Sequence, residues 1–232
     1  MESLLRPNDR RAKNAITLIW IILTLEIISL ISGYLQYDLL NTAANGGEIS
    51  IESANSNDNR EQIIGIVYSI VYIISAVMFI QWFRRAYFNL HQITNTLKYK
   101  EGWAAGAWFV PVLSLFRPYQ IMKDLFIKTK EYLSVKNLDN NNNLSTEIIG
   151  WWWTLWIANN FLSQVVVRYS MRAETIDELT NMTLANIFLN IFGIPLALIA
   201  IKMIKNYSSV ESLLVKSSEE DQIDKIDTHN TV

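Results

Sequence analysis

The residues that could do chemistry in this chain are polar side chains inside otherwise apolar stretches. Glu26 lies near the middle of such a stretch, where an unpaired ionised carboxylate would cost about 3 kcal/mol in a bilayer. We therefore expect Glu26 to face other helices and to be paired, hydrated or protonated. Other apolar stretches carry phenols and amides on shared helical faces: Tyr68 and Tyr72, Asn160 and Gln164, and Asn186 and Asn190.

Two functions are open to these polar groups. They could line a central cavity that binds a proton or a cation, or they could form hydrogen bonds between helices, each worth about 0.6–2 kcal/mol. Helix packing is the simpler function, because amides and phenols serve it without further requirements. A small channel or transporter would instead use Glu26, Asn160, Gln164 and Asn190.

The sequence predicts no catalytic residue, no metal site and no bound cofactor. It contains no cysteine, which excludes disulfides and thiolate chemistry. It also lacks the zinc-protease, serine-hydrolase, phosphate-loop and dinucleotide-binding motifs. His91 stands alone near two arginines and is best explained as a solvated helix residue. We do not expect an enzyme, although a lipid-active enzyme that uses Arg84, Arg85 or His91 stays an alternative.

A second set of polar and aromatic residues follows the second apolar stretch. Trp82, Arg85 and Asn89 fall on one helical face, at positions i, i+3 and i+7. Arginines at a membrane surface either bind lipid phosphates or anchor the helix by reaching into the headgroup layer. The candidate headgroup or partner site comprises Trp82, Arg84, Arg85, Asn89, Trp103, Trp108, Arg117, Tyr119 and Gln120.

Four apolar stretches must position these residues. A bilayer core of about 30 Å requires about 20 helical residues, and residues 15–35, 63–83, 148–167 and 184–201 meet or approach that length. Charged residues make up 18% of the chain, below the roughly 25% of soluble domains. The expected fold is all-α: an integral membrane four-helix bundle within a membrane domain at residues 15–206.

The distribution of lysine and arginine predicts the orientation. These residues gather before the first stretch, between the second and third, and after the fourth. Positively charged segments stay in the cytoplasm, so both termini, including a tail at residues 1–14, are predicted to be cytoplasmic. The formal net charge of -2 provides no basic field for nucleic acid, which we do not expect as a partner.

Residues 102–116 are apolar but too few to cross a bilayer. As a helix they would reach about 22 Å, and Pro111 would bend them. We expect a re-entrant or interfacial helical segment on the cytoplasmic side, because a fifth crossing would reverse the orientation of everything downstream. Residues 117–133 then predict a basic amphipathic helix along the inner leaflet. The acidic residues 207–232 predict a disordered tail.

Several sequence blocks identify a family resemblance. They are WFRRAYFNL at 82–90, GWAAGAWFVPVL at 102–113, RPYQIMK at 117–123 and WWWTLW at 151–156. In this order they resemble the bacterial membrane family catalogued as domain of unknown function 4328, over about residues 63–205. The resemblance implies a multi-span protein of the bacterial inner membrane, and it implies no catalytic residues.

The expected function is that of a membrane scaffold or accessory subunit. Its cytoplasmic face would bind lipid headgroups, anionic ones in particular, or a protein partner, which could be a second copy of the chain. The alternative is the channel or transporter built around Glu26.

Overall fold

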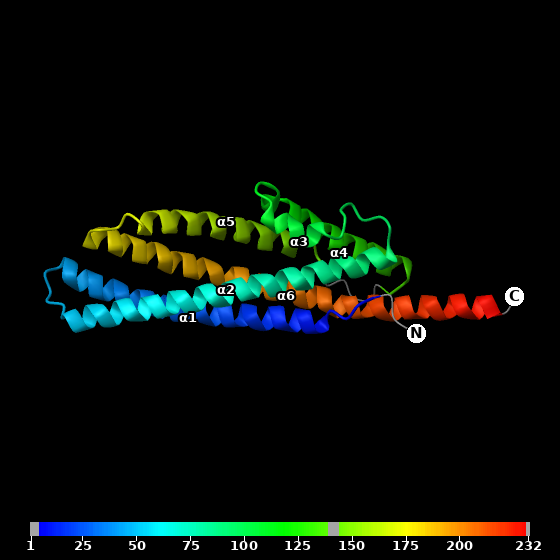
Figure 1. Cartoon of the computed structure of the whole chain (residues 1–232), viewed down its shortest axis with the longest axis horizontal. Helices are drawn as coiled ribbons and strands as arrows, with labels where there is room; N and C mark the ends of the chain where they lie inside the picture. Colours follow the sequence, from blue (N-terminus) through cyan, green and yellow to red (C-terminus); the bar gives the residue numbers. More distant parts are fainter. Residues whose placement is uncertain (1–4, 139–143, 231–232) are drawn as a thin grey trace. The chain divides into compact units, whose positions relative to one another are not determined.

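A computed structural model describes residues 5–138 and 144–230, with side chains up to residue 215 and at Ser217 (Figure 1). Within this part of the chain the backbone forms α-helices and short 3-10 helices and no strand, which confirms the all-α fold class. The elements in order are α1 (Asp9–Ala44), α2 (Ile51–Ile93), α3 (Trp103–Gly106), η1 (Ala107–Phe109), η2 (Leu113–Leu115), α4 (Arg117–Val135), α5 (Glu147–Ser170) and α6 (Ile176–Asn230).

Among the described residues, three helices are long and apolar enough to cross a membrane. They are α1, α2 and the portion Ile176–Val215 of α6, and they contain the predicted spans 15–35, 63–83 and 184–201. The remaining predicted span, 148–167, which is the third in chain order, lies in α5. Tryptophans and amides lower the hydropathy of α5, so its crossing stays a prediction.

Two of these helices are much longer than a bilayer core is thick. α2 has 43 residues and α6 has 55, which correspond to about 65 and 80 Å of helix. A core of about 30 Å holds fewer than half of either length. Arg84 therefore lies just beyond the apolar stretch of α2, and Glu211 lies about 15 Å beyond residue 201 in α6.

Both predicted tails differ from expectation. α6 continues to Asn230, so residues 207–230 are helical where the sequence predicts disorder; residues 231 and 232 lie outside the described part. The physical reason is that Tyr207, Val210 and Leu214 extend the apolar face of the helix and are buried. At the other end α1 begins at Asp9, inside the predicted tail of residues 1–14.

The chain divides into two compact units. Unit 1 comprises Met1–Ile16, Ala76–Trp151 and Ile201–Val232, and unit 2 comprises Thr17–Ser75 and Trp152–Ala200. Three of the four blocks of the family resemblance lie in unit 1, and the fourth, at 151–156, lies in unit 2 except for Trp151. The predicted spans supply most of unit 2.

The core of unit 1 is aromatic. The Tyr207 ring lies 6.1 Å from that of Trp82, edge to face, and 5.5 Å from that of Phe126. Trp82, Phe126 and Tyr207 are fully buried, as are Ile121 and Leu125 of α4. The amphipathic helix predicted at 117–133 is thus confirmed as a helix, but its apolar side packs on protein and is not available to the inner leaflet.

The segment 102–116 is not one helix. It consists of α3, η1 and η2, with Pro111 between the two 3-10 helices, as the proline predicts. Val112 has a φ of 67°, a strained value for a β-branched residue. Ala104 and Ala107 are buried, while Phe109 is 77% and Val112 68% exposed.

Candidate functional site

The most strongly charged feature of unit 1 is a hollow lined by arginines. It encloses about 260 Å³, and we call it the arginine hollow. Its lining residues are Arg6, Arg11, Gln81, Arg84, Arg85, Phe88 and Glu101. Two of the four arginines come from the start of the chain and two from α2, directly after its apolar stretch.

The positive charge of the arginine hollow exceeds its negative charge. Arg84 Nε lies 3.5 Å from Glu101 Oε1, and this pair is largely exposed. The Arg6 guanidinium lies 4.6 Å from the centre of the Phe88 ring, a cation–π distance. Burial lowers the pKa of Arg85, and the like charges of the other arginines lower it further. An anion bound here would relieve that repulsion.

The N-terminal segment 5–12 is held in place by buried amides. The Asn89 side chain pairs with the backbone of Arg6: Oδ1 accepts from the Arg6 N–H at 3.0 Å, and Nδ2 donates to the Arg6 carbonyl at 2.9 Å. Asn8 Nδ2 donates to both carboxylate oxygens of Glu211, at 3.2 and 2.9 Å, and approaches the Trp82 carbonyl at 3.4 Å. These contacts fix Arg6 at the arginine hollow, and α1 positions Arg11 there.

Glu211 is the buried carboxylate at the centre of this arrangement. It is 5% exposed, and Asn89 Nδ2 also donates to its Oε1 at 2.8 Å. Burial raises the pKa of Glu211 to about 7, although the hydrogen bonds from Asn8 and Asn89 oppose that rise. We call Asn8, Asn89 and Glu211 the clasp.

The nine residues predicted for the cytoplasmic site do not form one site. Arg84 and Arg85 line the arginine hollow, Asn89 belongs to the clasp, and Trp82 lies in the core. Around Tyr99 a separate network forms: its hydroxyl donates to Gln120 at 2.9 Å, and the Arg117 guanidinium lies 4.5 Å from its ring centre. The others are placed as follows: Trp103 is partly exposed, Tyr119 is half-buried and Trp108 Nε1 donates to the Ala104 carbonyl at 3.1 Å.

The structure brings together only part of the predicted intramembrane set. In unit 2 Glu26 is buried and accepts a hydrogen bond from the Tyr68 hydroxyl at 2.7 Å, so its predicted burial and pairing are confirmed. Tyr72 stacks on Tyr68 with ring centres 6.1 Å apart. A Cβ added at Gly193 would lie 2.7 Å from Glu26 Cδ, so α6 passes very close to the carboxylate.

The predicted amides of unit 2 do not join Glu26. Asn160 Nδ2 donates to the carbonyl of Trp156 on its own helix at 2.8 Å. Asn186 and Asn190 are half-buried, and Gln164 is exposed. The placement of Gln164 in a central cavity therefore stays a prediction.

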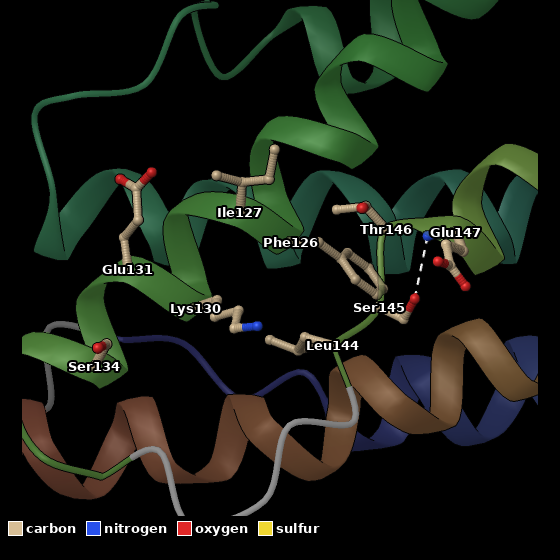
Figure 2. Close-up of a pocket in the computed structure, with 9 residues that line it drawn as sticks. All are labelled: Phe126, Ile127, Lys130, Glu131, Ser134, Leu144, Ser145, Thr146 and Glu147. Carbon is tan, nitrogen blue, oxygen red and sulfur yellow. Dashed lines mark hydrogen bonds between the residues drawn. The ribbon is translucent and has the colours of Figure 1, made fainter.

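A larger cavity of about 590 Å³ lies between α4 and the start of α5 in unit 1 (Figure 2). Its charged lining residues are Lys130, Glu131 and Glu147. At its rim the Glu147 N–H donates to Ser145 Oγ at 3.2 Å, a local serine turn at the start of α5. With one cation and two anions among polar and apolar neighbours, this cavity does not select a ligand by charge.

A protein-family model matches residues 45–209 of the chain, and its description is a domain of unknown function, DUF4328. The chain belongs to this family. The match confirms the resemblance read from the four sequence blocks. No curated protein and no solved structure matches the chain.

The DUF4328 match includes Arg84, Arg85 and Asn89, whereas Asn8 and Glu211 fall on either side of it. Sequence reasoning missed these last two because it assigned both ends of the chain to tails. One signal was present: Met203, Tyr207, Val210 and Leu214 continue a helical apolar face beyond the last span. A polar residue beside that face, such as Glu211, is then expected to be buried.

Proposed function

We propose that this DUF4328 protein is a multi-pass protein of the bacterial inner membrane that binds anionic lipid headgroups at its cytoplasmic face. It would act there as a scaffold or accessory subunit. The observation that carries the proposal is the arginine hollow, where four guanidiniums meet one carboxylate at the end of an apolar helix. No catalytic step and no nucleic acid enter this proposal.

The chemistry of the arginine hollow fits a phosphate. Guanidinium groups present paired N–H donors that match phosphate oxygens, and they are less strongly hydrated than ammonium groups. The volume of about 260 Å³ is slightly below the roughly 300–1,000 Å³ of pockets for whole small molecules. It therefore suits a lipid headgroup whose acyl chains stay outside.

The position of the hollow along α2 supports a lipid as the source of that phosphate. Arg84 and Arg85 directly follow the apolar stretch 63–83, which would bring them to the headgroup layer. In this topology α1, α2, α5 and α6 cross the membrane, α5 being the third crossing, and both termini are cytoplasmic. The exposed apolar residues Phe109 and Val112 would contact the membrane interface from the same side.

The test compares two neighbouring arginines. Arg11 lines the hollow, whereas Arg10 is exposed and does not. We expect R11Q to weaken retention of phosphatidylglycerol by about tenfold, because a hydrogen bond to a charged group contributes about 1.5–3 kcal/mol. R10Q should bind like the wild type. The measurement is native mass spectrometry of the full chain with phosphatidylglycerol or phosphatidylcholine; equal retention of the two lipids would refute the proposal.

A second candidate function rests on the contact between Glu26 and Tyr68. A buried carboxylate with one phenol donor, inside an apolar helix, can carry a proton across the dry part of a membrane. In proteoliposomes with an internal pH-sensitive dye, E26Q should then abolish proton flux. Glu52→Gln, at an exposed acid near the start of α2, should retain it. Absence of flux in the wild type would leave Glu26 as a packing group.

A further inference from the structure

One arginine of the arginine hollow, Arg6, lies on the segment that precedes α1. Arg84 and Arg85 are fixed within α2, but Arg6 precedes α1 and Arg11 lies in its first turns. Arg6 is exposed, and both its backbone N–H and its carbonyl pair with the side chain of Asn89. Arg6 therefore stays in the hollow only while its backbone is held by Asn89, whereas Arg11 is positioned by α1.

The clasp joins three parts of the chain that are far apart in sequence. Asn8 comes from the N-terminal segment, Asn89 from α2 and Glu211 from α6. All three side chains are at most 5% exposed. The side-chain carbonyl of Asn89 accepts from Arg6, and its NH2 group donates to both Arg6 and Glu211. A change in the protonation of Glu211 can therefore affect the position of Arg6 through Asn89.

We propose that Asn8, Asn89 and Glu211 are positioning residues of the arginine hollow, and that protonation of Glu211 closes the N-terminal segment and strengthens anion binding. This inference rests on the proposed function, because it regulates the same site. It assigns a role to a buried carboxylate that neither the family nor the hollow itself explains.

The charged groups around Glu211 determine the sign of the effect. Asp9 of α1 raises its pKa and Arg85 of α2 lowers it, while Tyr207, one turn earlier on α6, is electrostatically coupled to it. Burial is the largest cause and raises the pKa from 4.5 to about 7. When the segment opens, water reaches Glu211 and the pKa falls back towards 4.5. The closed form thus binds the proton more tightly, and closure is favoured as the pH falls through 7.

Protonation of Glu211 also strengthens anion binding directly, through its charge. Protonation removes a negative charge that interacts with Arg85, so the hollow becomes more attractive to an anion. By linkage, an anion in the hollow must in turn promote proton uptake by Glu211. Closure of the segment and the gain in positive potential therefore both strengthen anion binding at low pH.

The first experiment measures phosphatidylglycerol binding to the full chain in nanodiscs at about pH 6 and about pH 8, on either side of the Glu211 pKa. The phosphodiester of this lipid keeps a single charge throughout that range. We expect wild-type affinity to be at least about fivefold higher at the lower pH, within the usual range of coupling between sites. E211Q, which stays neutral, should bind at both pH values as tightly as the wild type does at the lower one.

Asn8→Ala provides a second variant in case E211Q folds poorly. It keeps Glu211 but removes the side chain that joins the segment to it. Affinity should then fall at both pH values to the level of R11Q. A wild-type pH dependence that persists unchanged in E211Q would overturn the proposal, and so would an Asn8→Ala variant with wild-type affinity.

A distance measurement separates failure of this inference from failure of the proposed function. Because the chain has no cysteine, spin labels can be placed at P7C, before α1, and S212C alone; both positions are exposed. The distance distribution should be narrow at about pH 6 and broader at about pH 8, and narrow at both in E211Q. If the distances change with pH but the protein does not prefer phosphatidylglycerol to phosphatidylcholine, the lipid proposal fails and the role of the clasp is supported. If the protein prefers phosphatidylglycerol but the distances do not change with pH, the proposed role of the clasp is wrong.

Discussion

At the scale of single residues, Gly193 tests how tightly unit 2 is packed around Glu26. An added Cβ would lie 2.7 Å from Glu26 Cδ, so the carboxyl group or α6 would have to move. We expect Gly193→Ala to lower the free energy of unfolding by about 1–3 kcal/mol, the usual cost of overpacking. Reversible unfolding in mixed micelles measures this change.

Gly65→Ala is the matched control, because nothing lies within 4 Å of a Cβ at Gly65. Alanine favours a helix over glycine by about 1 kcal/mol, so this variant should be as stable as the wild type or more so. Equal losses at both glycines would contradict the close approach of α6 to Glu26. Sequence reasoning predicted the burial of Glu26 from the cost of a charge in lipid, but it could not predict which of several phenols and amides would reach the carboxylate.

At the scale of elements, α4 shows what periodicity can predict and what it cannot. The spacing of Ile121, Leu125 and Phe126 predicts an amphipathic helix, and the structure has one at Arg117–Val135. Periodicity does not say what covers the apolar side, since protein and lipid both accept it. The sequence predicted that the inner leaflet covers the apolar side of α4, whereas the aromatic core of unit 1 covers it.

Leu125→Ala distinguishes a protein-covered α4 from a lipid-covered one. Leu125 is fully buried, so we expect the free energy of unfolding to fall by about 2–5 kcal/mol as a cavity opens. Val135→Ala, at a residue that is 82% exposed on the same helix, should change it by less than about 0.5 kcal/mol. Chemical unfolding monitored by tryptophan fluorescence measures both. A loss at Leu125 no larger than at Val135 would indicate that lipid covers this face.

At the scale of the whole molecule, the pattern of apolar stretches and charges predicted the helical class and three of the candidate spans. It did not predict the extension of α6 to Asn230, because acidic composition alone was taken to mean disorder. Nor did it predict the arginine hollow, which combines residues separated by about a third of the chain. Long-range pairings of this kind carry no local signal in one sequence.

The orientation of the chain gives the last prediction, and α5 decides it. If α5 crosses the membrane, Ser170 at its end faces outward, while Lys123 in α4 faces the cytoplasm, as the distribution of lysine and arginine requires. Since the chain has no cysteine, S170C and K123C each introduce a single thiol, and both positions are exposed. A membrane-impermeant maleimide applied to intact spheroplasts should label S170C and spare K123C, and permeabilisation should make both reactive.

Protection of S170C in intact cells would mean that α5 stays on the cytoplasmic side. The loop before α6 would then be cytoplasmic, and the C-terminal part of α6, with Glu211, would lie on the opposite side of the membrane from Arg84 and Arg85. The hydrogen bond between Asn89 and Glu211 is incompatible with that arrangement, so protection of S170C would also contradict the clasp.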